Sequence, residues 1–119
     1  MSDSPYDYAI LDVRKVVDGD TVDLTLGKDI GFYVSTVVNV RFRLLGVDAP
    51  ERGKPGAAEA TEYLRAWLAA NAGRARCSSH KADSFGRWLA YIYITREDGT
   101  VSSLNDDLVA AGHAVVYVR

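Results

Sequence analysis

Residues 8–26 read YAILDVRKVVDGDTVDLTL, two runs rich in β-branched and aromatic residues joined by Asp-Gly at positions 18–19. Asp-Gly suits a tight hairpin turn because both positions tolerate positive φ. After the turn, Val22, Leu24 and Leu26 alternate with polar residues, which is the pattern of a strand with one solvated face. This stretch therefore predicts a β-hairpin near the start of the chain.

The hairpin is followed by further β-rich sequence and then by a helix. Gly27-Lys28-Asp29 is predicted as the next turn, and residues 30–47 as one bent strand or two. Residues 55–71 carry apolar side chains at three- and four-residue spacing with charged residues between them. That spacing predicts an amphipathic helix, which we expect to end near Gly73.

The last third of the sequence alternates strand and helix signals. Residues 74–81 and 87–94 read as a hairpin with a loop through 83–86, and 98–99 as a turn. Ser102 or Ser103 can cap a short helix that Gly112 ends, and residues 115–118 form a last strand. The order of elements predicts a mainly β protein with helices (α+β), an OB-type barrel with two packed helices.

Length and composition limit the number of domains and the class of protein. The 119 residues fit one domain, with residues 1–7 as a flexible N-terminal tail. No segment approaches the roughly 18 apolar residues of a membrane helix. The polar, acidic N-terminus does not resemble a signal peptide, so we expect a soluble and, by default, cytoplasmic protein. The lone Cys77 is expected to be a small packed side chain.

The charge balance restricts how the protein could bind a polyanion. Fourteen basic and 16 acidic residues give a net charge of -2. Attraction over the whole molecule would therefore not draw it onto nucleic acid, and any such affinity must be local.

Three carboxylates lie at or beside predicted turns, where periodicity gives them no packing role: Asp20, Asp48 and Glu51. Oxygen ligands in loops suit calcium or magnesium. Paired histidines or cysteines, which zinc would require, are absent from the sequence. The alternative is that these are ordinary turn residues, since turns favour such types. An EF-hand is excluded, because its glycine position would hold Asp23.

Two arginines accompany these carboxylates. Arg43 lies within an otherwise hydrophobic strand, and Arg87 follows Gly86 at the start of another. A guanidinium presents a planar fork of donors that matches two phosphate oxygens. A salt bridge on a sheet face is the simpler alternative for either arginine.

Taken together, four segments resemble those of the staphylococcal nuclease (thermonuclease) family. They are residues 17–22 (VDGDTV), 41–51 (RFRLLGVDAPE), 85–93 (FGRWLAYIY) and 108–114 (LVAAGHA). The resemblance runs from about Val13 to the end and keeps the order and rough spacing of the segments. It implies an SNase-like OB-type five-stranded barrel that acts as a calcium-dependent nuclease, a hydrolase that cleaves DNA or RNA phosphodiesters.

The resemblance also implies a role for each site residue. Asp20 and Asp48 would bind Ca²⁺ through their carboxylates and Ala49 through its backbone carbonyl. Glu51 would be the general base or would orient the attacking water. Arg43 and Arg87 would bind the scissile phosphate and stabilise its developing charge.

The sequence departs from the best-known family member at the substrate periphery. The loop at 52–55 is shorter, and Ser84 and Phe85 stand where that member has a lysine and a tyrosine that contact a terminal phosphate. That member continues past the last strand into a third helix, whereas this sequence stops at Arg119, so we expect either a domain that is complete without that helix or another chain that covers the surface it would occupy. Tyr117 reads equally as a base-stacking residue or as an ordinary strand-end aromatic.

Two other functions compete with the nuclease. One is an adaptor that keeps the barrel but binds nucleic acid or protein without cleaving it. The other is a structural subunit of a larger particle. All five catalytic and carboxylate metal positions carry the expected residue types, which favours the enzyme, with single-stranded or frayed DNA or RNA as the expected substrate.

Overall fold

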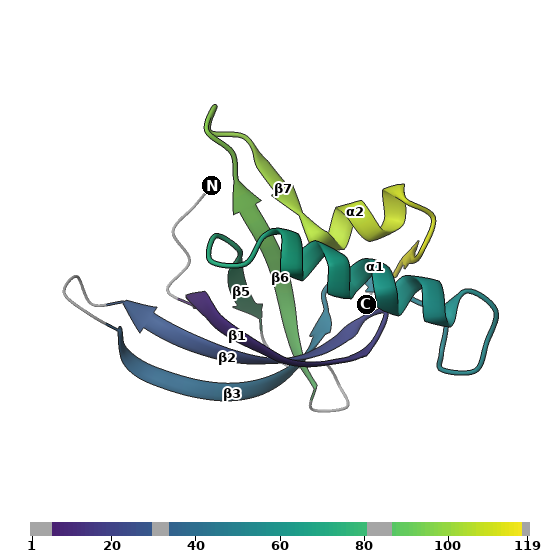
Figure 1. The fold of residues 1–119 in the computed structure, drawn as a ribbon, viewed down its shortest axis with the longest axis horizontal. Coiled ribbons are helices and arrows are strands. Elements are labelled where there is room, and N and C mark those ends of the chain that lie inside the picture. The colour runs from purple at the N-terminus through teal and green to yellow at the C-terminus, as the bar shows by residue number, and fades with distance from the viewer. Residues whose placement is uncertain (1–5, 30–33, 81–86, 118–119) are drawn as a thin grey trace.

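The computed structural model of this chain describes residues 6–29, 34–80 and 87–117 (Figure 1). The predicted loop at 83–86, with Ser84, Phe85 and Gly86, lies outside those residues, as does the end of the predicted last strand at 118. The elements are β1 (Asp7–Asp18), β2 (Thr21–Asp29), β3 (Val34–Leu44), β4 (Val47–Asp48), α1 (Ala57–Ala70), β5 (Arg76–His80), β6 (Trp88–Thr95), β7 (Val101–Ser103), α2 (Leu104–Ala110) and β8 (Val115–Val116).

The strands close into a barrel. The sheet runs β3-β2-β1-β5-β6-β7, and a parallel pairing between β3 and β6 joins its two sides. Strands β3, β2, β1, β5 and β6 thus form a closed ring, to which β7 adds at the far end of β6. The predicted fold class, a mainly β OB-type five-stranded barrel with two helices, is confirmed for the described residues.

Two local predictions about β1 and β2 were wrong. Asp7 was predicted in a flexible tail, but it begins β1, pairs with Ser78, and forms an ion pair with Arg76 at 2.7 Å. The turn predicted at Gly27-Lys28-Asp29 belongs to β2. The backbone there continues the ladder with β3, so Gly27 pairs with Val37. The long partner strand outweighs the local turn preference of these residues.

The helices end and begin as their sequence signals predict. Gly73, with φ of +84°, lies just past α1. At the start of α2, Ser103 Oγ accepts a hydrogen bond from the Asp106 N–H at 2.9 Å. The residues of α1 that were predicted to face the core are buried: Ala57, Ala60, Leu64, Trp67, Leu68.

The core fills the barrel and the space beneath the helices. Phe42, Leu24 and Leu44 are among its largest buried side chains, and the Cys77 thiol is fully buried. Burial raises the pKa of that thiol to about 12, which makes it an inert packed side chain, as the sequence predicted.

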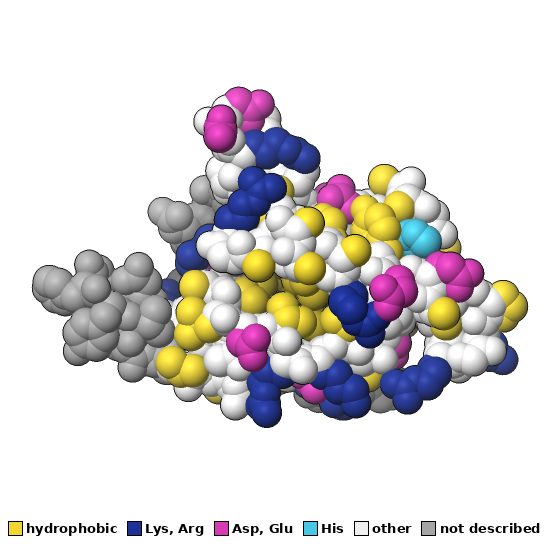
Figure 2. Space-filling model, in the orientation of Figure 1, with side chains coloured by type: hydrophobic (Ala, Val, Ile, Leu, Met, Phe, Trp, Pro, Cys, Tyr) yellow, Lys and Arg dark blue, Asp and Glu magenta, His cyan; other side chains and the backbone are white. Residues whose placement is uncertain are grey.

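α1 lies across the barrel beside β1 (Figure 1). Hydrophobic side chains gather in a hollow on this face, and basic side chains lie along its lower edge in the same view (Figure 2). The hollow is a groove of about 430 Å³ between β1 and α1. None of the helices in the described residues is long and apolar enough to cross a membrane.

Candidate functional site

The turn between β1 and β2 fixes Asp20. Asp18 Oδ1 accepts the Asp20 N–H at 3.2 Å, an Asx-type contact that shapes the turn. The Asp20 carbonyl accepts the Leu44 N–H at 2.8 Å, and Thr21 Oγ1 donates to Asp20 Oδ1 at 3.0 Å. The carboxylate of Asp20 is therefore held at the point where the hairpin meets the end of β3.

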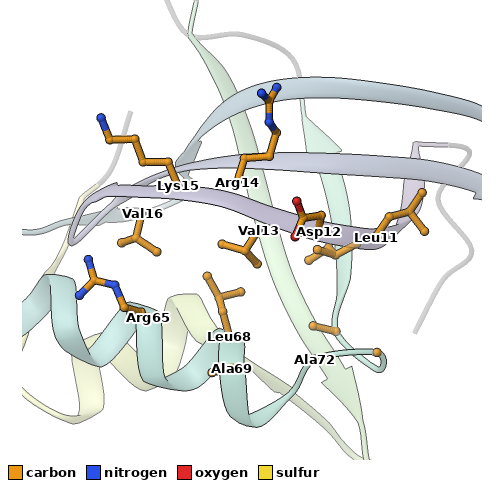
Figure 3. Close-up of a pocket in the computed structure, with 13 residues that line it drawn as sticks. Leu11, Asp12, Val13, Arg14, Lys15, Val16, Arg65, Leu68, Ala69 and Ala72 are labelled. Carbon is orange, nitrogen blue, oxygen red and sulfur yellow. The ribbon is translucent and has the colours of Figure 1, made fainter.

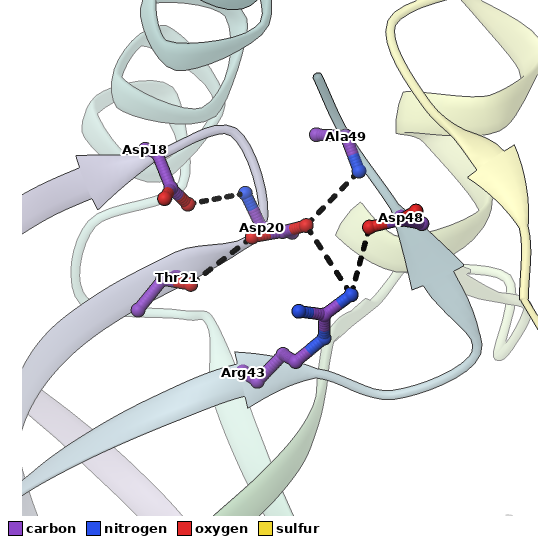
Figure 4. Close-up of polar contacts among 6 residues, drawn as sticks. All are labelled: Asp18, Asp20, Thr21, Arg43, Asp48 and Ala49. Carbon is purple, nitrogen blue, oxygen red and sulfur yellow. Dashed lines mark hydrogen bonds and ion pairs between the residues drawn. The ribbon is translucent and has the colours of Figure 1, made fainter. Parts of the chain in front are cut away.

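Asp48 reaches the same point from β4. Arg43 Nη2 lies 2.8 Å from Asp48 Oδ1 and 3.6 Å from Asp20 Oδ2 (Figure 4). The Asp48 side chain is 47% exposed, whereas Asp20 and Arg43 are largely buried. Two carboxylates, one from the β1–β2 turn and one from β4, thus converge on one guanidinium nitrogen, and that of Asp48 borders solvent.

The electrostatics of this cluster favour additional positive charge. Burial, together with the hydrogen bond to Asp18, raises the pKa of Asp20 to about 6, against the lowering effects of the Ala49 N–H and of Arg43. Arg43 Nε is buried and, within the described residues, has no hydrogen-bond partner. One guanidinium is therefore shared by two carboxylates and still has an unused donor.

Ala49 contributes to the cluster through its amide. Its N–H donates to Asp20 Oδ2 at 3.0 Å, which ties the β1–β2 turn to the end of β4. The sequence assigned Ala49 a different role, a carbonyl ligand for calcium. That role stays a prediction.

Glu51 and Arg87 lie around this cluster. Glu51 is exposed in the turn after β4, where its carbonyl accepts the Lys54 N–H at 2.9 Å. Arg87 is exposed and directly precedes β6. The parallel register pairs Arg43 with Leu89, so the start of β6 lies beside the strand that carries Arg43. The catalytic roles predicted for Glu51 and Arg87 stay predictions.

Two residues that help to build the site, Tyr117 and Asn105, were not assigned a firm role from the sequence. The Arg43 guanidinium lies 5.8 Å from the centre of the Tyr117 ring, which restrains it by a cation–π contact. Asn105 is buried and bonds to Leu45, Ala90 and Ile92, the backbone just beyond the two arginine-bearing segments. An asparagine among the apolar residues of α2 was the signal that could have identified it.

The donor set fits a hard cation. Asp20 and Asp48 supply oxygen ligands, which calcium prefers, and Asp48 borders solvent. Their negative charge exceeds what Arg43 alone neutralises. Among the described residues, no group of three or more His, Cys, Asp or Glu side chains is placed to hold a metal. A calcium ion here would therefore also need backbone or water ligands.

Comparisons with known proteins identify the family of the chain. The family described as staphylococcal nuclease homologue matches residues 41–119. An uncharacterized protein of Methanocaldococcus jannaschii, MJ1439, is 30% identical over 132 aligned residues, covering 89% of this chain and 58% of the relative. The match begins after the β1–β2 turn, and Asp20 joins that turn to the matched region through its contacts with Arg43, Leu44 and Ala49.

Proposed function

Because the chain belongs to the staphylococcal nuclease homologue family, we propose that it is a calcium-dependent nuclease that hydrolyses phosphodiester bonds of DNA or RNA. The observation that carries the proposal is the convergence of Asp20 and Asp48 on Arg43 Nη2, at 3.6 and 2.8 Å. A phosphodiester is anionic and repels a nucleophile, so a site that hydrolyses it has to neutralise charge and position water.

Each residue then has a defined task. Asp20, Asp48 and the Ala49 carbonyl would hold calcium, which would supply Lewis-acid polarisation of a phosphate oxygen. Arg43, with its unused buried Nε–H, and Arg87 would bind the phosphate oxygens and stabilise the charge that builds on them. Arg87 does not serve as a proton donor, because a guanidinium stays protonated at any working pH.

Glu51 is suited to act on water. It is exposed, and within the described part of the chain its carboxylate makes no hydrogen bond or ion pair that would have to be broken first. It would accept a proton from the attacking water and orient that water toward phosphorus. A carboxylate is a weak base, so orientation is its larger contribution.

The experiment is cleavage of denatured DNA by the intact protein with calcium and, in parallel, with a chelator. Glu51→Gln and Arg87→Ala are measured beside it. We expect cleavage that requires calcium and that falls by about 10²-fold or more in each variant, as when a charge-stabilising donor is removed. No calcium-dependent cleavage by the intact protein, or full activity in both variants, contradicts the proposal.

The alternative function, a non-catalytic adaptor, gives a different result in a companion measurement. If the intact protein binds a labelled oligonucleotide but leaves it uncut in calcium, the adaptor replaces the nuclease. Single-stranded and duplex DNA and RNA of the same sequence, compared in one assay, then identify the nucleic acid that it prefers.

A further inference from the structure

A β-bulge in β1 turns two consecutive basic residues to the same side of the strand. Val13 pairs with Leu24 and Lys15 pairs with Asp23, so Arg14 is the extra residue between two successive pairs. Figure 3 shows Arg14 and Lys15 pointing away from α1, whereas Val13 and Val16 point toward it. Without the bulge, neighbouring residues would face opposite sides of the sheet.

The sheet register places these residues one row from the candidate site. Lys15 of β1 pairs with Asp23 of β2, and Asp23 in turn pairs with Arg41 of β3. We call these three residues, together with Arg14, the Lys15 row. The adjacent row on this face contains Asp18, Thr21 and Arg43. Residues two apart along a strand lie about 7 Å apart on one face, comparable with the spacing of neighbouring phosphates in an extended nucleic-acid strand.

The cationic side chains of the Lys15 row have hydrogen-bond donors that can bind an anionic group. Arg14 and Lys15 are exposed, and within the described residues neither forms an ion pair. Arg41 is 60% exposed, and its Nε and Nη2 hold Asp23 at 2.7 and 3.0 Å, the side-chain bonds it makes within the described residues. Its remaining N–H groups are available for an acceptor. The Lys15 row thus contains three cationic side chains and one carboxylate, although the net charge of the protein is -2.

The surface shape at this row suits a small anionic group. Arg14, Asp23 and Arg41 line a depression of about 220 Å³, together with Leu24, Asn39 and Val40. Asp23 fixes the orientation of the Arg41 guanidinium by accepting hydrogen bonds from Nε and Nη2. The depression is open, so a strand could pass over it rather than end in it.

We propose that the Lys15 row is a second phosphate-binding subsite, which holds the backbone phosphate next to the scissile one on a single strand of nucleic acid. The proposal rests on the proposed nuclease function for the position of the scissile phosphate. Contacts to phosphates carry no sequence information, so the subsite affects the length of strand that binds and the salt dependence, not base preference.

The first test is equilibrium binding of a fluorescent oligothymidylate, with chelator present so that no turnover occurs. Affinity is measured against salt concentration for the intact protein and for Arg14→Ala/Lys15→Ala. Each lost phosphate contact on a single strand reduces the slope of log K against log salt by about 0.7, and the subsite holds one phosphate, so we expect a reduction of about 0.7. Arg65→Ala/Arg96→Ala is the control, because it removes the same charge elsewhere on the surface.

The second test is cleavage of the same oligonucleotide and of a dinucleotide. We expect Arg14→Ala/Lys15→Ala to raise KM for the oligonucleotide several-fold with kcat unchanged, and to leave dinucleotide cleavage unaffected. An unchanged salt slope, or an equal loss of slope in the control, overturns the subsite. If the intact protein cuts neither substrate, the nuclease proposal fails, and the salt slope still decides whether the row binds phosphate.

Discussion

At the scale of single residues, Arg43 explains why this cluster suits an anionic substrate together with a cation. It shares Nη2 between Asp48 and Asp20, at 2.8 and 3.6 Å, and its buried Nε has no partner among the described residues. A buried donor without a partner is unfavourable by about 1–3 kcal/mol. A phosphate oxygen that accepted from Nε would recover that free energy at the position where charge has to be stabilised.

Tyr93 gives a residue-scale prediction about alkaline pH. Burial and the hydrogen bond that its hydroxyl donates to Asp7 raise the pKa of Tyr93 from 10.0 to about 12. The unfolded chain therefore loses this proton first. The stabilisation is complete below pH 10 and disappears as the pH rises toward 12.

We expect the free energy of unfolding of the intact protein, measured with urea, to fall across this pH range. The fall should be smaller in Tyr93→Phe, which has no proton to lose at that position. Tyr6→Phe serves as a control on an exposed tyrosine outside the strands. Identical pH slopes for the intact protein and Tyr93→Phe would contradict the assignment.

From the sequence, the site could be predicted as a set of residue types but not as an arrangement in space. Turn chemistry put Asp20 and Asp48 beside loops, and Arg43 was singled out as a charged residue within an otherwise hydrophobic strand. Their approach to one another depends on β2–β3 and β4–β8 pairings that join residues far apart in the chain. The Ala49 N–H bond to Asp20, across 29 residues, has no local sequence signal.

At the scale of elements, Asn105 joins α2 to β6 and to the turn between β3 and β4. Its Oδ1 accepts the Ile92 N–H at 3.0 Å, and its Nδ2 donates to the Leu45 and Ala90 carbonyls at 2.9 and 3.0 Å. Asn105→Ala would remove the side-chain partner of the Ile92 N–H and of the Leu45 carbonyl, whereas the Ala90 carbonyl would keep the bond that it accepts from the Leu45 N–H. We expect a loss of about 3 kcal/mol in the free energy of unfolding.

The matched control is Asn39→Ala, which removes an exposed hydrogen bond between Asn39 and Thr25. Exposed substitutions of this kind change stability by about 0.5 kcal/mol or less. Urea unfolding of the three proteins measures both effects. Equal losses at the two positions would refute a bridging role for Asn105.

Gly19 sets how closely the β1–β2 turn approaches α1 and β4. A Cβ at this position would lie 2.6 Å from the Ala60 Cβ and 2.8 Å from the Ala49 Cβ. Gly19→Ala should therefore displace the turn and break the bond between the Ala49 N–H and Asp20. We expect faster amide hydrogen exchange at Ala49, measured by NMR.

Gly73→Ala is the comparison for Gly19→Ala. Gly73 has φ of +84°, and a Cβ there meets no atom within 4 Å. This substitution strains the backbone at the end of α1 without touching the turn, so Ala49 exchange should not change. Equal acceleration in both variants would mean that Ala49 reports global stability rather than the local approach.

Elements with strong local signals were predictable, and those set by long-range pairing were not. The apolar spacing of α1 specifies that helix locally. The hairpin was predicted at its correct place, but its turn residues are Gly19 and Asp20 rather than Asp18 and Gly19, and neither has positive φ. Gly27 has turn chemistry but lies in β2, because β3 is long enough to pair with it. The parallel pairing of β3 with β6, which closes the barrel, leaves no mark in either strand's own sequence.

At the scale of the whole molecule, charge distribution matters more than net charge. The chain carries -2 overall, yet Arg43 and the Lys15 row lie on adjacent rows of one sheet face. A local basic track can bind a strand of nucleic acid while the rest of the surface repels it. Such binding depends strongly on salt and is limited to the strand that crosses this face.

The most direct test of the account is calcium-dependent cleavage of single-stranded DNA at saturating substrate by the intact protein, Arg43→Lys and Arg96→Lys. Lysine keeps the charge of Arg43 but loses the planar fork and Nε. We predict calcium-dependent cleavage by the intact protein, a fall in kcat of about 10²-fold in Arg43→Lys and no change in Arg96→Lys. Full activity in Arg43→Lys, or no cleavage by the intact protein, would contradict it.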